Sequence, residues 1–467
     1  MTGFSSTSDN SISQARDTMK QNAYLTFICT VAMFGGLMFG FDIAIISGAN
    51  TSLQSYFNLD ELELGWGTGS LVLGAMIGAL GSGALTDTFG RKKVLIYVAL
   101  LFALSCMGSA LSQTFVAFVL SRILGGLSVG AASVLSPMYV AEVAPRKIRG
   151  TLVSLYQLTI VIGILVSYLI NYGLYGVKND WRWMFATGTV PSVLFFLGLF
   201  AIPESPRWLY LNGNREKSRA IIDRIAGAAD ADLEIEEMTK TLEAQKSTTK
   251  LRELLSPPTR KAAFAGFLIA GLVQLDGMNA VVNYAPKIFQ GVGFETQNAL
   301  LKTSFVGLIN FLFTFVAIAL IDRVGRKTLY LTGSLGMAVA LLCLTTTYFV
   351  HLEGVLTLVF VLAFVAFFAA CIGPVFWTLV SEIFPNRIRG KAVALASSIQ
   401  WSVYFLVALL FPRFLELVGG GFAFLFFAVM VLLQFFVVRQ YLPETKGKSL
   451  EEIEMRWNEP PAAGRKN

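Results

Sequence analysis

Long, nearly uncharged apolar runs recur along the whole chain, and they constrain its fold more than any other feature. A helix that crosses a bilayer needs about 20 mostly apolar residues. Six such runs precede a polar gap and six follow it. They lie at about 22–49, 65–86, 94–112, 114–141, 151–176 and 183–203, then at about 260–289, 298–321, 328–350, 355–381, 391–417 and 421–442. We therefore predict an all-α membrane protein with twelve transmembrane helices in two six-helix bundles.

The composition also indicates that a bilayer surrounds most of this chain. Hydrophobic residues make up 55% of the 467 residues and charged residues only 14%, with a mean hydropathy of +0.63. A soluble protein carries about a quarter charged residues. The net charge of +7 is spread over short loops, which argues against a nucleic-acid partner. The four cysteines lie in apolar runs without metal-ligand spacing, so no metal or cofactor is expected.

Lys and Arg are concentrated in alternate loops, and this bias predicts the orientation of the chain. Basic clusters lie at 91–93, 146–149, 323–327 and 387–391, whereas the first opposite loop is acidic around 60–63. Basic loops stay in the cytoplasm. Both termini are therefore expected on the cytoplasmic side of the cell membrane.

Five segments follow from this pattern. Residues 1–21 are polar and are expected to be a disordered cytoplasmic tail, and 22–203 form the N-terminal six-helix bundle. Residues 204–258 mix apolar and charged residues at helical spacing, which predicts intracellular amphipathic helices. Residues 259–442 form the C-terminal six-helix bundle, and 443–467 form a second cytoplasmic tail.

Two loop motifs recur at nearly one offset, which indicates an internal duplication. Asp87, followed by Gly-Arg-Lys, recurs as Asp322, and 322 − 87 = 235. Glu142, followed by Pro and Arg, recurs as Glu382, and 382 − 142 = 240. A looser echo links Pro203-Glu204 with Pro443-Glu444. Parallel six-helix repeats predict two related halves with a substrate site between them near the bilayer midplane.

These motifs together resemble those of a known family. Further motifs are Arg122-Ile-Leu-Gly-Gly, Pro203-Glu-Ser-Pro-Arg207-Trp208-Leu and Leu442-Pro-Glu-Thr-Lys-Gly. From about residue 25 to 455 the chain resembles the sugar porter family of the major facilitator superfamily, and especially its bacterial proton-coupled xylose and hexose symporters. The resemblance implies the major facilitator fold with a cytoplasmic helical linker, and transport of a monosaccharide by alternating access rather than an enzymatic reaction.

The charged residues of the repeated loops are the candidates for a cytoplasmic gate. Carboxylates and guanidinium groups at a membrane edge form strong bidentate pairs. Such pairs can hold the cytoplasmic faces of the halves together, which is the role that the resemblance implies; the alternative is that they only set topology and helix register. The candidates are Asp87, Arg91, Glu142, Arg149, Asp322, Arg326, Glu382 and Arg389.

An acid, Asp42, lies inside the first apolar run. A carboxylate there is costly unless it is paired or faces water. The comparably placed cation is Arg122 in the fourth run. If the arginine moves relative to the acid during transport, the acid binds and releases a proton. The resemblance implies this proton-coupling role, because the proton-coupled relatives carry an Asp and an Arg at these positions. A static ion pair in a uniporter is the alternative.

Amide and tryptophan side chains inside the runs are the candidates for the sugar site. Sugars are bound by groups that both donate and accept hydrogen bonds, and by an aromatic wall. The alternative is that the amides only join helices to one another. The candidates are Gln157, Gln274, Asn279, Asn283, Asn310, Trp377, Gln400 and Trp401. The resemblance implies that Trp377 stacks on the ring of a hexose. It also implies that four of the amides form hydrogen bonds to the hexose, namely Gln157, Gln274, Asn279 and Asn310.

The chain departs from the family pattern close to these candidates. Val273, Asn283 and Gln400 stand where the family usually has Gln, Tyr and Asn. Asp276 is a second acid near the expected site. These differences leave open whether the sugar is a pentose, another hexose epimer or a polyol.

Three other functions compete with proton-coupled transport. Asp42 with Arg122 argues against a facilitator without proton coupling, and the short tails argue against a non-transporting sugar sensor. No nucleophile–base pair or phosphate loop is evident in the runs, which argues against a membrane enzyme. The expected partners are thus a sugar, a proton and the lipid bilayer, and the chain is expected to be a monomer.

Overall fold

The computed structural model describes residues 5–145, 148–244, 256, 259–352, 354–385, 388–446 and 452. Every regular element in this part of the chain is a helix. The helices of the first half and the linker are α1 (Ser5–Phe57), α2 (Glu61–Phe89), α3 (Arg91–Leu111), α4 (Phe115–Val143), α5 (Arg149–Leu174), α6 (Asp180–Thr187), α7 (Thr189–Ala201), α8 (Pro206–Leu211), α9 (Arg215–Ala226) and α10 (Ala228–Ala244). Those of the second half are α11 (Arg260–Leu272), η2 (Val273–Leu275), α12 (Met278–Gln290), α13 (Thr296–Val324), α14 (Arg326–Phe349), α15 (Val355–Cys371), α16 (Gly373–Ile383) and α17 (Arg389–Tyr441).

The twelve predicted spans are all present. Eleven helical stretches of the described residues are long and apolar enough to cross a membrane. One of these, α17, contains two spans, because its 53 residues are interrupted at Gly419, which has φ 77° and ψ 164°. Glycine adopts this conformation readily, which allows a direct turn between the last two spans. The chain is therefore a multi-pass membrane protein.

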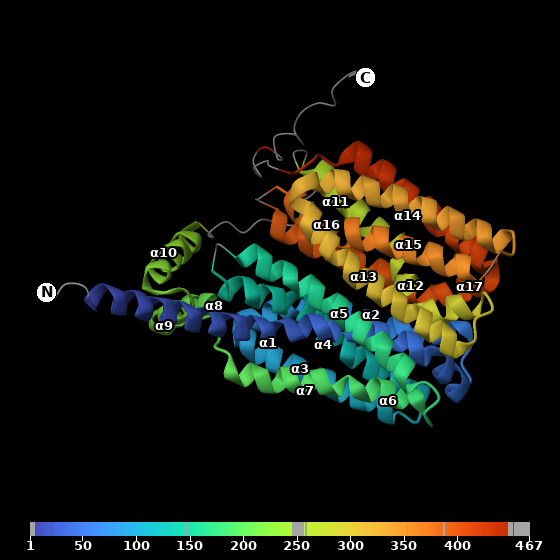
Figure 1. Cartoon of the computed structure of the whole chain (residues 1–467), viewed down its shortest axis with the longest axis horizontal. Coiled ribbons are helices and arrows are strands. Elements are labelled where there is room, and N and C mark those ends of the chain that lie inside the picture. Colours follow the sequence, from blue (N-terminus) through green and yellow to red (C-terminus); the bar gives the residue numbers. More distant parts are fainter. Residues whose placement is uncertain are drawn as a thin grey trace, which may run out of the picture.

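The helices form two bundles that lie side by side, α1 to α7 in one and α11 to α17 in the other (Figure 1). Within the first bundle α2 packs on α4 and α1 packs on α5; within the second, α14 packs on α15 and α17. The most extensive contacts between the two halves are those of α2 with α17, α5 with α13 and α1 with α12. A site between the halves is therefore bordered by α1, α2, α5, α12, α13 and α17.

Glycine allows the close packing of α2 on α4. A Cβ atom on Gly126 would lie 2.0 Å from the carbonyl oxygen of Leu71, and one on Gly130 would lie 2.0 Å from that of Ala75. Small residues at such contacts let membrane helices approach closely enough for dispersion contacts between backbones. The many glycines of the chain therefore contribute directly to the bundle.

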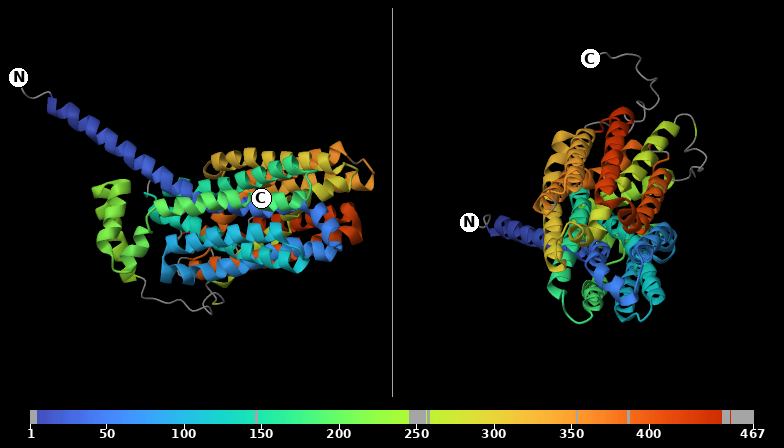
Figure 2. Two further views of the ribbon diagram at one scale, coloured as in Figure 1. Left: turned by 90° about the horizontal axis from the view of Figure 1, so that it is seen from below. Right: turned by 90° about the vertical axis from the view of Figure 1, so that its right-hand side faces the viewer.

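The linker between the halves forms three short helices, α8 to α10, as its helical spacing predicts. They lie at the end of the molecule from which the N-terminal part of α1 projects (Figure 2). This part differs from the prediction, because α1 begins at Ser5 and so is helical where a disordered tail is expected. The sequence contains no Gly or Pro between Ser5 and Asn22 to stop the helix that the apolar span nucleates. Most of 245–258 and of the C-terminal tail lies outside the described residues.

Two spans of the second half are broken inside the bundle. The tenth span is divided into α15 and α16 at Ile372, where Gly373-Pro374 begins the second helix. The seventh span is divided at Asp276 and Gly277, between η2 and α12, and Gly277 has φ 95°. The sequence predicts one uninterrupted run over 260–289, so this break corrects the prediction; the run is apolar on both sides of Gln274, Asp276 and Asn279, and its length alone does not reveal the break.

Candidate functional site

Asp42 and Arg122 lie side by side in the interior of the first half. Asp42 on α1 is 2% exposed and Arg122 on α4 is 1% exposed. A guanidinium nitrogen of Arg122 donates to Oδ1 of Asp42, and the second one donates to the carbonyl oxygen of Asp42 at 3.2 Å. The pair thus joins the two helices by an ion pair in an apolar environment, where it interacts far more strongly than in water.

The pair leaves hydrogen-bonding capacity unused. Oδ2 of Asp42 and Nε of Arg122 are buried without a partner among the described residues. The Arg122 guanidinium also lies 5.2 Å from the ring centroid of Phe185, a cation–π distance. Gly125 provides space beside the carboxylate, because a Cβ atom there would lie 3.3 Å from Oδ2 of Asp42 and 2.4 Å from Oγ of Ser105. The free oxygen of Asp42 is therefore a position at which a proton can be held.

The break in the seventh span brings two of the predicted sugar ligands together. Gln274 lies in η2 and Asn279 in the first turn of α12. The Asn279 amide donates to Oε1 of Gln274 across the break. In the described residues Gln157 on α5 is half-buried and has no hydrogen-bond partner for its amide. These amides lie on helices that border the contact between the halves, where a hydroxyl-rich ligand requires donors and acceptors.

Asn283, another predicted sugar ligand, makes contacts of a different kind. It is 1% exposed, and its amide donates to the hydroxyl of Tyr404 at 3.1 Å. The amide of Asn50, on α1, donates to the carbonyl oxygen of Asn283 at 3.0 Å. The structure therefore uses Asn283 to connect helices, including one of the opposite half.

The remaining candidates are spread over α13, α16 and α17. Asn310 on α13 is 5% exposed. Trp377 on α16 is 44% exposed, so one part of its indole is free of protein contacts. Trp401 on α17 contacts Phe39 of α1 with ring centroids 5.9 Å apart, and its neighbour Gln400 is half-buried. Trp401 thus lies at the contact between halves, on the helix that also carries Tyr404.

The halves are joined at the end that carries the acidic loop. Lys287 on α12 forms an ion pair with Glu61 at the start of α2. The hydroxyl of Tyr168 on α5 donates to the carbonyl oxygen of Val282 at 2.8 Å. A Cβ atom on Gly65 would lie 1.9 Å from the carbonyl oxygen of Leu409, so α2 and α17 are in backbone contact here. We call this set of contacts the distal seal, because it lies away from the linker.

At the linker end, the predicted gate residues of the first half form a buried network. Arg91 makes a bidentate pair with Glu142, with two nitrogen–oxygen distances of 3.0 Å. Their side chains are only 8% and 7% exposed, whereas Asp87, 3.5 Å from Arg91, is 78% exposed. Ser205, next to α8, donates to Glu142. These pairs join α2, α3, α4 and the linker within one half.

The second half repeats this network with the matching residues. Arg326 pairs with Glu382 at 3.5 Å, and Arg389 donates to the carbonyl oxygen of Phe384 at 3.2 Å. In the first half Arg149 donates to the equivalent Ala144 oxygen at the same distance, and 384 − 144 = 240. The side chain of Asp322 lies outside the described residues.

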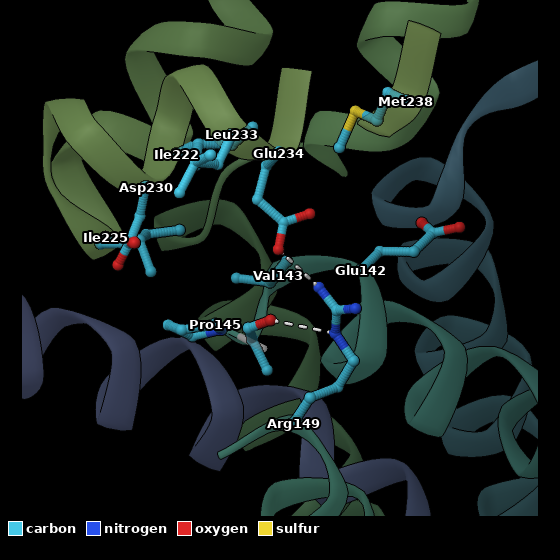
Figure 3. A pocket seen from close by; sticks show the side chains of 12 residues that line it. Glu142, Val143, Pro145, Arg149, Ile222, Ile225, Asp230, Leu233, Glu234 and Met238 are labelled. Carbon is cyan, nitrogen blue, oxygen red and sulfur yellow. Dashed lines mark hydrogen bonds and ion pairs between the residues drawn. The ribbon is translucent and has the colours of Figure 1, made fainter. Parts of the chain in front are cut away.

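Arg149 connects the first half to the linker rather than to Glu142. Its guanidinium donates to Glu234 of α10 at 3.0 Å, and Figure 3 shows Glu142 turned away from it. Arg149 and Glu234 border a cavity of about 220 Å³. Apolar side chains of α9 and α10, among them Ile222 and Leu233, also line it. The linker is therefore fixed to the α4–α5 loop by an ion pair and by apolar contacts.

Two acids outside the predicted set of gate residues bind the backbone next to these networks. Glu204 accepts from the backbone N–H of Arg91 at 2.9 Å, and Glu444 accepts from that of Arg326 at the same distance. Each carboxylate therefore caps the first turn of a helix. The backbone turns in front of these helices are glycines with φ 90° and 102°, beside which the carboxylates lie. The looser echo of Pro-Glu at 203 and 443 was the available signal.

Glu444 lies outside the spans, at the start of the C-terminal tail. Burial tends to raise the pKa of its carboxyl group, but the backbone N–H groups of Lys446, Thr328, Lys327 and Arg326 favour the carboxylate. The net result is a pKa below the ordinary value. The cap is therefore an anion at neutral pH.

Comparison with known proteins identifies the family. Residues 28–457 match the model of the family described as Sugar (and other) transporter. The chain is 40% identical to the arabinose-proton symporter of Bacillus subtilis over 93% of its own length and 95% of that protein, and 37% identical to the D-xylose-proton symporter of Escherichia coli K12 over 94% and 97%. Its structure resembles the inward open conformation of the xylose transporter XylE from E. coli with a TM-score of 0.83, at 36% identity, covering 93% of this chain and 100% of that one. With these helices, this repeat and these matches, the chain belongs to the Sugar (and other) transporter family.

Proposed function

We propose that this protein is a proton-coupled monosaccharide symporter that works by alternating access. The observation that carries the proposal is the buried Asp42–Arg122 pair inside one half of a sugar transporter. An ion pair with an unpartnered carboxylate oxygen in a span is costly to keep for stability alone, since apolar residues of similar volume often serve as well. Curated relatives over nearly the whole chain are named as arabinose and D-xylose symporters of protons, which supports the same function.

In this proposal the amides and tryptophans near the contact between halves bind the sugar. Gln157, Gln274, Asn279 and Asn310 donate and accept hydrogen bonds, Trp377 covers an apolar face of the ring, and Gln400 and Trp401 complete the wall. Asn283 contributes through its contacts with Asn50 and Tyr404 rather than as a direct ligand.

We propose that the conformation described above is inward-facing. The protein is proposed to lie in the cell membrane as a monomer, with both termini and the linker in the cytoplasm. The distal seal holds the outer ends of the halves together, and the similarity to an inward open relative supports the assignment. Opening to the outside then requires that the seal separates and that the linker-end networks approach each other. The gate residues act in that second step.

Transport of a sugar panel tests the proposal. Cells that lack their own sugar transporters are supplied with this chain and with labelled D-xylose, L-arabinose or D-glucose, with and without a protonophore. We expect accumulation of at least one sugar against its gradient, and its loss with the protonophore. Uptake that the protonophore leaves unchanged would identify a uniporter, and binding without uptake a sensor.

The proposed gate has its own test. Glu382→Gln and Arg149→Ala are expected to leave the protein in the membrane but to slow transport, because each removes one charge of a linker-end pair. Normal turnover at normal expression would leave these residues a role in topology only.

A further inference from the structure

The seventh span carries a second buried acid at its break. Asp276 is fully buried between η2 and α12, and its Oδ1 accepts from the backbone N–H of Met278 at 2.8 Å. The first N–H groups of a helix have no partner within the helix, so this bond caps α12. Asp276 thereby holds the chain in the conformation that starts α12 after the break.

The next residue fixes the break from the other side. Gly277 has φ 95°, which residues with a Cβ atom rarely adopt. A Cβ atom there would also lie 2.8 Å from the ring of Phe427 on α17. The break is therefore a defined feature of the backbone. It is held by the bond of Asp276 to the first N–H group of α12 and by the packing of Gly277 against α17.

The break positions two of the proposed sugar ligands. Gln274 precedes Asp276 by two residues and Asn279 follows it by three, and their amides are hydrogen-bonded across the break. In a continuous α-helix, residues five apart lie on different faces. Their common orientation thus depends on the backbone conformation that Asp276 stabilises.

The environment of Asp276 differs from that of Asp42 in its charge. Oδ2 of Asp276 is buried without a hydrogen-bond partner, and no cation pairs with it in the described part of the chain. Tyr330 of α14 is a titratable neighbour of Asp276, and its hydroxyl accepts from Gln434 of α17. The side chains of Tyr330 and Gln434 are both buried and uncharged. An ionised carboxylate in this place would be a buried charge without compensation, which proteins avoid by keeping the group neutral.

We propose that Asp276 is a positioning residue for sugar binding: as a neutral carboxylic acid it caps α12 and holds the break that presents Gln274 and Asn279 to the sugar, and it neither releases nor takes up a proton during transport. The inference rests on the proposed function, since it assigns Asp276 to the sugar site of a symporter. The sugar contacts the two amides, and Asp276 acts through them.

Three variants test this role, each purified and reconstituted into vesicles. Asp276→Asn keeps an acceptor for the Met278 N–H group and places an NH2 donor where the acid has its hydroxyl; Asp276→Ser keeps a shorter acceptor; Asp276→Ala keeps none. The probes are D-xylose, L-arabinose and D-glucose, whichever of them the wild-type protein transports. KM, maximal rate, binding affinity and the pH profile of uptake are measured for each variant.

We expect Asp276→Ala to raise KM and the dissociation constant by about 10- to 100-fold, because the amides of Gln274 and Asn279 would be displaced from the positions in which they bind the sugar. The effect on the maximal rate is expected to be smaller. We expect Asp276→Ser to lie between Ala and the wild type. Asp276→Asn is expected to restore affinity to within about threefold, less than one ordinary hydrogen bond changes it, with an unchanged accumulation ratio and pH profile.

Other outcomes would overturn the assignment. If Asp276→Asn binds sugar normally but no longer accumulates it, or shifts the pH profile, Asp276 takes up and releases a proton during transport. If the affinities of Asp276→Ala equal those of the wild type, the cap does not position the amides. Should Asp276→Ala fail to fold by size-exclusion chromatography, the comparison of Asp276→Ser with Asp276→Asn decides, because equal affinities in these two would also contradict the role of the cap. Failure of the wild type to transport any sugar appears before the variants are measured and concerns the proposed function alone.

Discussion

The two halves of this transporter treat a buried acid in opposite ways. Asp42 in the first half lies against Arg122, and Asp276 in the second half lies among uncharged groups. Their positions nearly match in the repeat, since 276 − 42 = 234, close to the offset of 235 between Asp87 and Asp322. The residue that corresponds to Arg122 at the offset of 240, 122 + 240 = 362, is Leu362.

The two halves therefore differ in the presence of a cation, Arg122, more than in the presence of a buried acid. An arginine beside a buried carboxylate allows it to be ionised, so a change in their separation changes its affinity for a proton. A carboxyl group without a cation stays neutral and serves as a hydrogen-bonding group. In our account the first half couples transport to the proton, and the second half, with its broken helices, adapts to the sugar.

The largest expected effect comes from removing the cation. Arg122→Ala leaves Asp42 buried without its partner and is expected to destabilise the protein by about 3–5 kcal/mol. Thermal unfolding in detergent measures the loss. The double variant Asp42→Asn with Arg122→Leu should recover most of the stability without recovering accumulation. If Arg122→Ala unfolds like the wild type, the two halves do not differ in the way we describe.

The break in the second half is expected to be the next most sensitive feature. Gly277→Ala combines a positive φ with a contact of 2.8 Å to Phe427 and should cost about 2–4 kcal/mol, together with sugar affinity. Gly293→Ala is the matched control, because Gly293 has φ 88° but no atom within 4 Å of a Cβ atom. It should lose only about 1 kcal/mol of backbone strain and keep its affinity. Equal losses in both variants would show that the contact with Phe427 does not matter.

A smaller effect is expected at the distal seal, where the halves meet. Lys287→Gln removes an ion pair whose side chains are 25% and 17% exposed, which is worth about 1 kcal/mol. Because the pair bridges the halves, we expect a shift toward the outward-facing form, detected as faster labelling of a cysteine that replaces Thr68, which is buried on α2. Glu61→Gln should have the same effect, and the double variant should add little. Additive effects of the two changes would show that the residues act independently.

The smallest expected effect concerns the caps that both halves share. Glu444→Gln should cost about 0.3–1 kcal/mol at neutral pH, because it removes an anion from a helix N-terminus. The pKa of Glu444 is lowered in the folded protein, so its contribution is complete above the unfolded value, near 4.5, and is lost as the pH falls through the folded value. The difference in melting temperature between the wild type and the variant should therefore disappear in acid. A difference that persists at low pH would point to packing rather than charge.

Much of this arrangement can be predicted from the sequence, because it depends on composition and on the repeat. The spans follow from the lack of charge in runs of about 20 residues. The pairing of Asp42 with Arg122 follows from the cost of either charge alone in an apolar interior. The repeated Glu and Arg residues predict the linker-end networks.

The rest depends on geometry that spacing does not encode. Arg149 contacts Glu234 instead of Glu142 because the linker folds back on the α4–α5 loop, a long-range contact without a local pattern. The break at Asp276 lies in a run long enough to be one span, so the length of the run hides it, although the Asp-Gly pair inside the span is a signal that can be read as a cap and a turn. The contacts of Asn283 with Asn50 and Tyr404 join helices that are far apart in the sequence, which residue spacing does not predict.

Sugar-dependent proton movement shows whether Asp42 couples the flux of sugar to the flux of protons. Wild-type protein and Asp42→Asn are reconstituted into vesicles that contain a pH indicator. The sugar that the wild type transports is added outside, and no pH difference is imposed across the membrane. We predict that sugar entry through the wild type acidifies the interior, while Asp42→Asn exchanges labelled for unlabelled sugar with no change in internal pH. Acidification of equal extent by Asp42→Asn would contradict the claim that this acid couples the two fluxes.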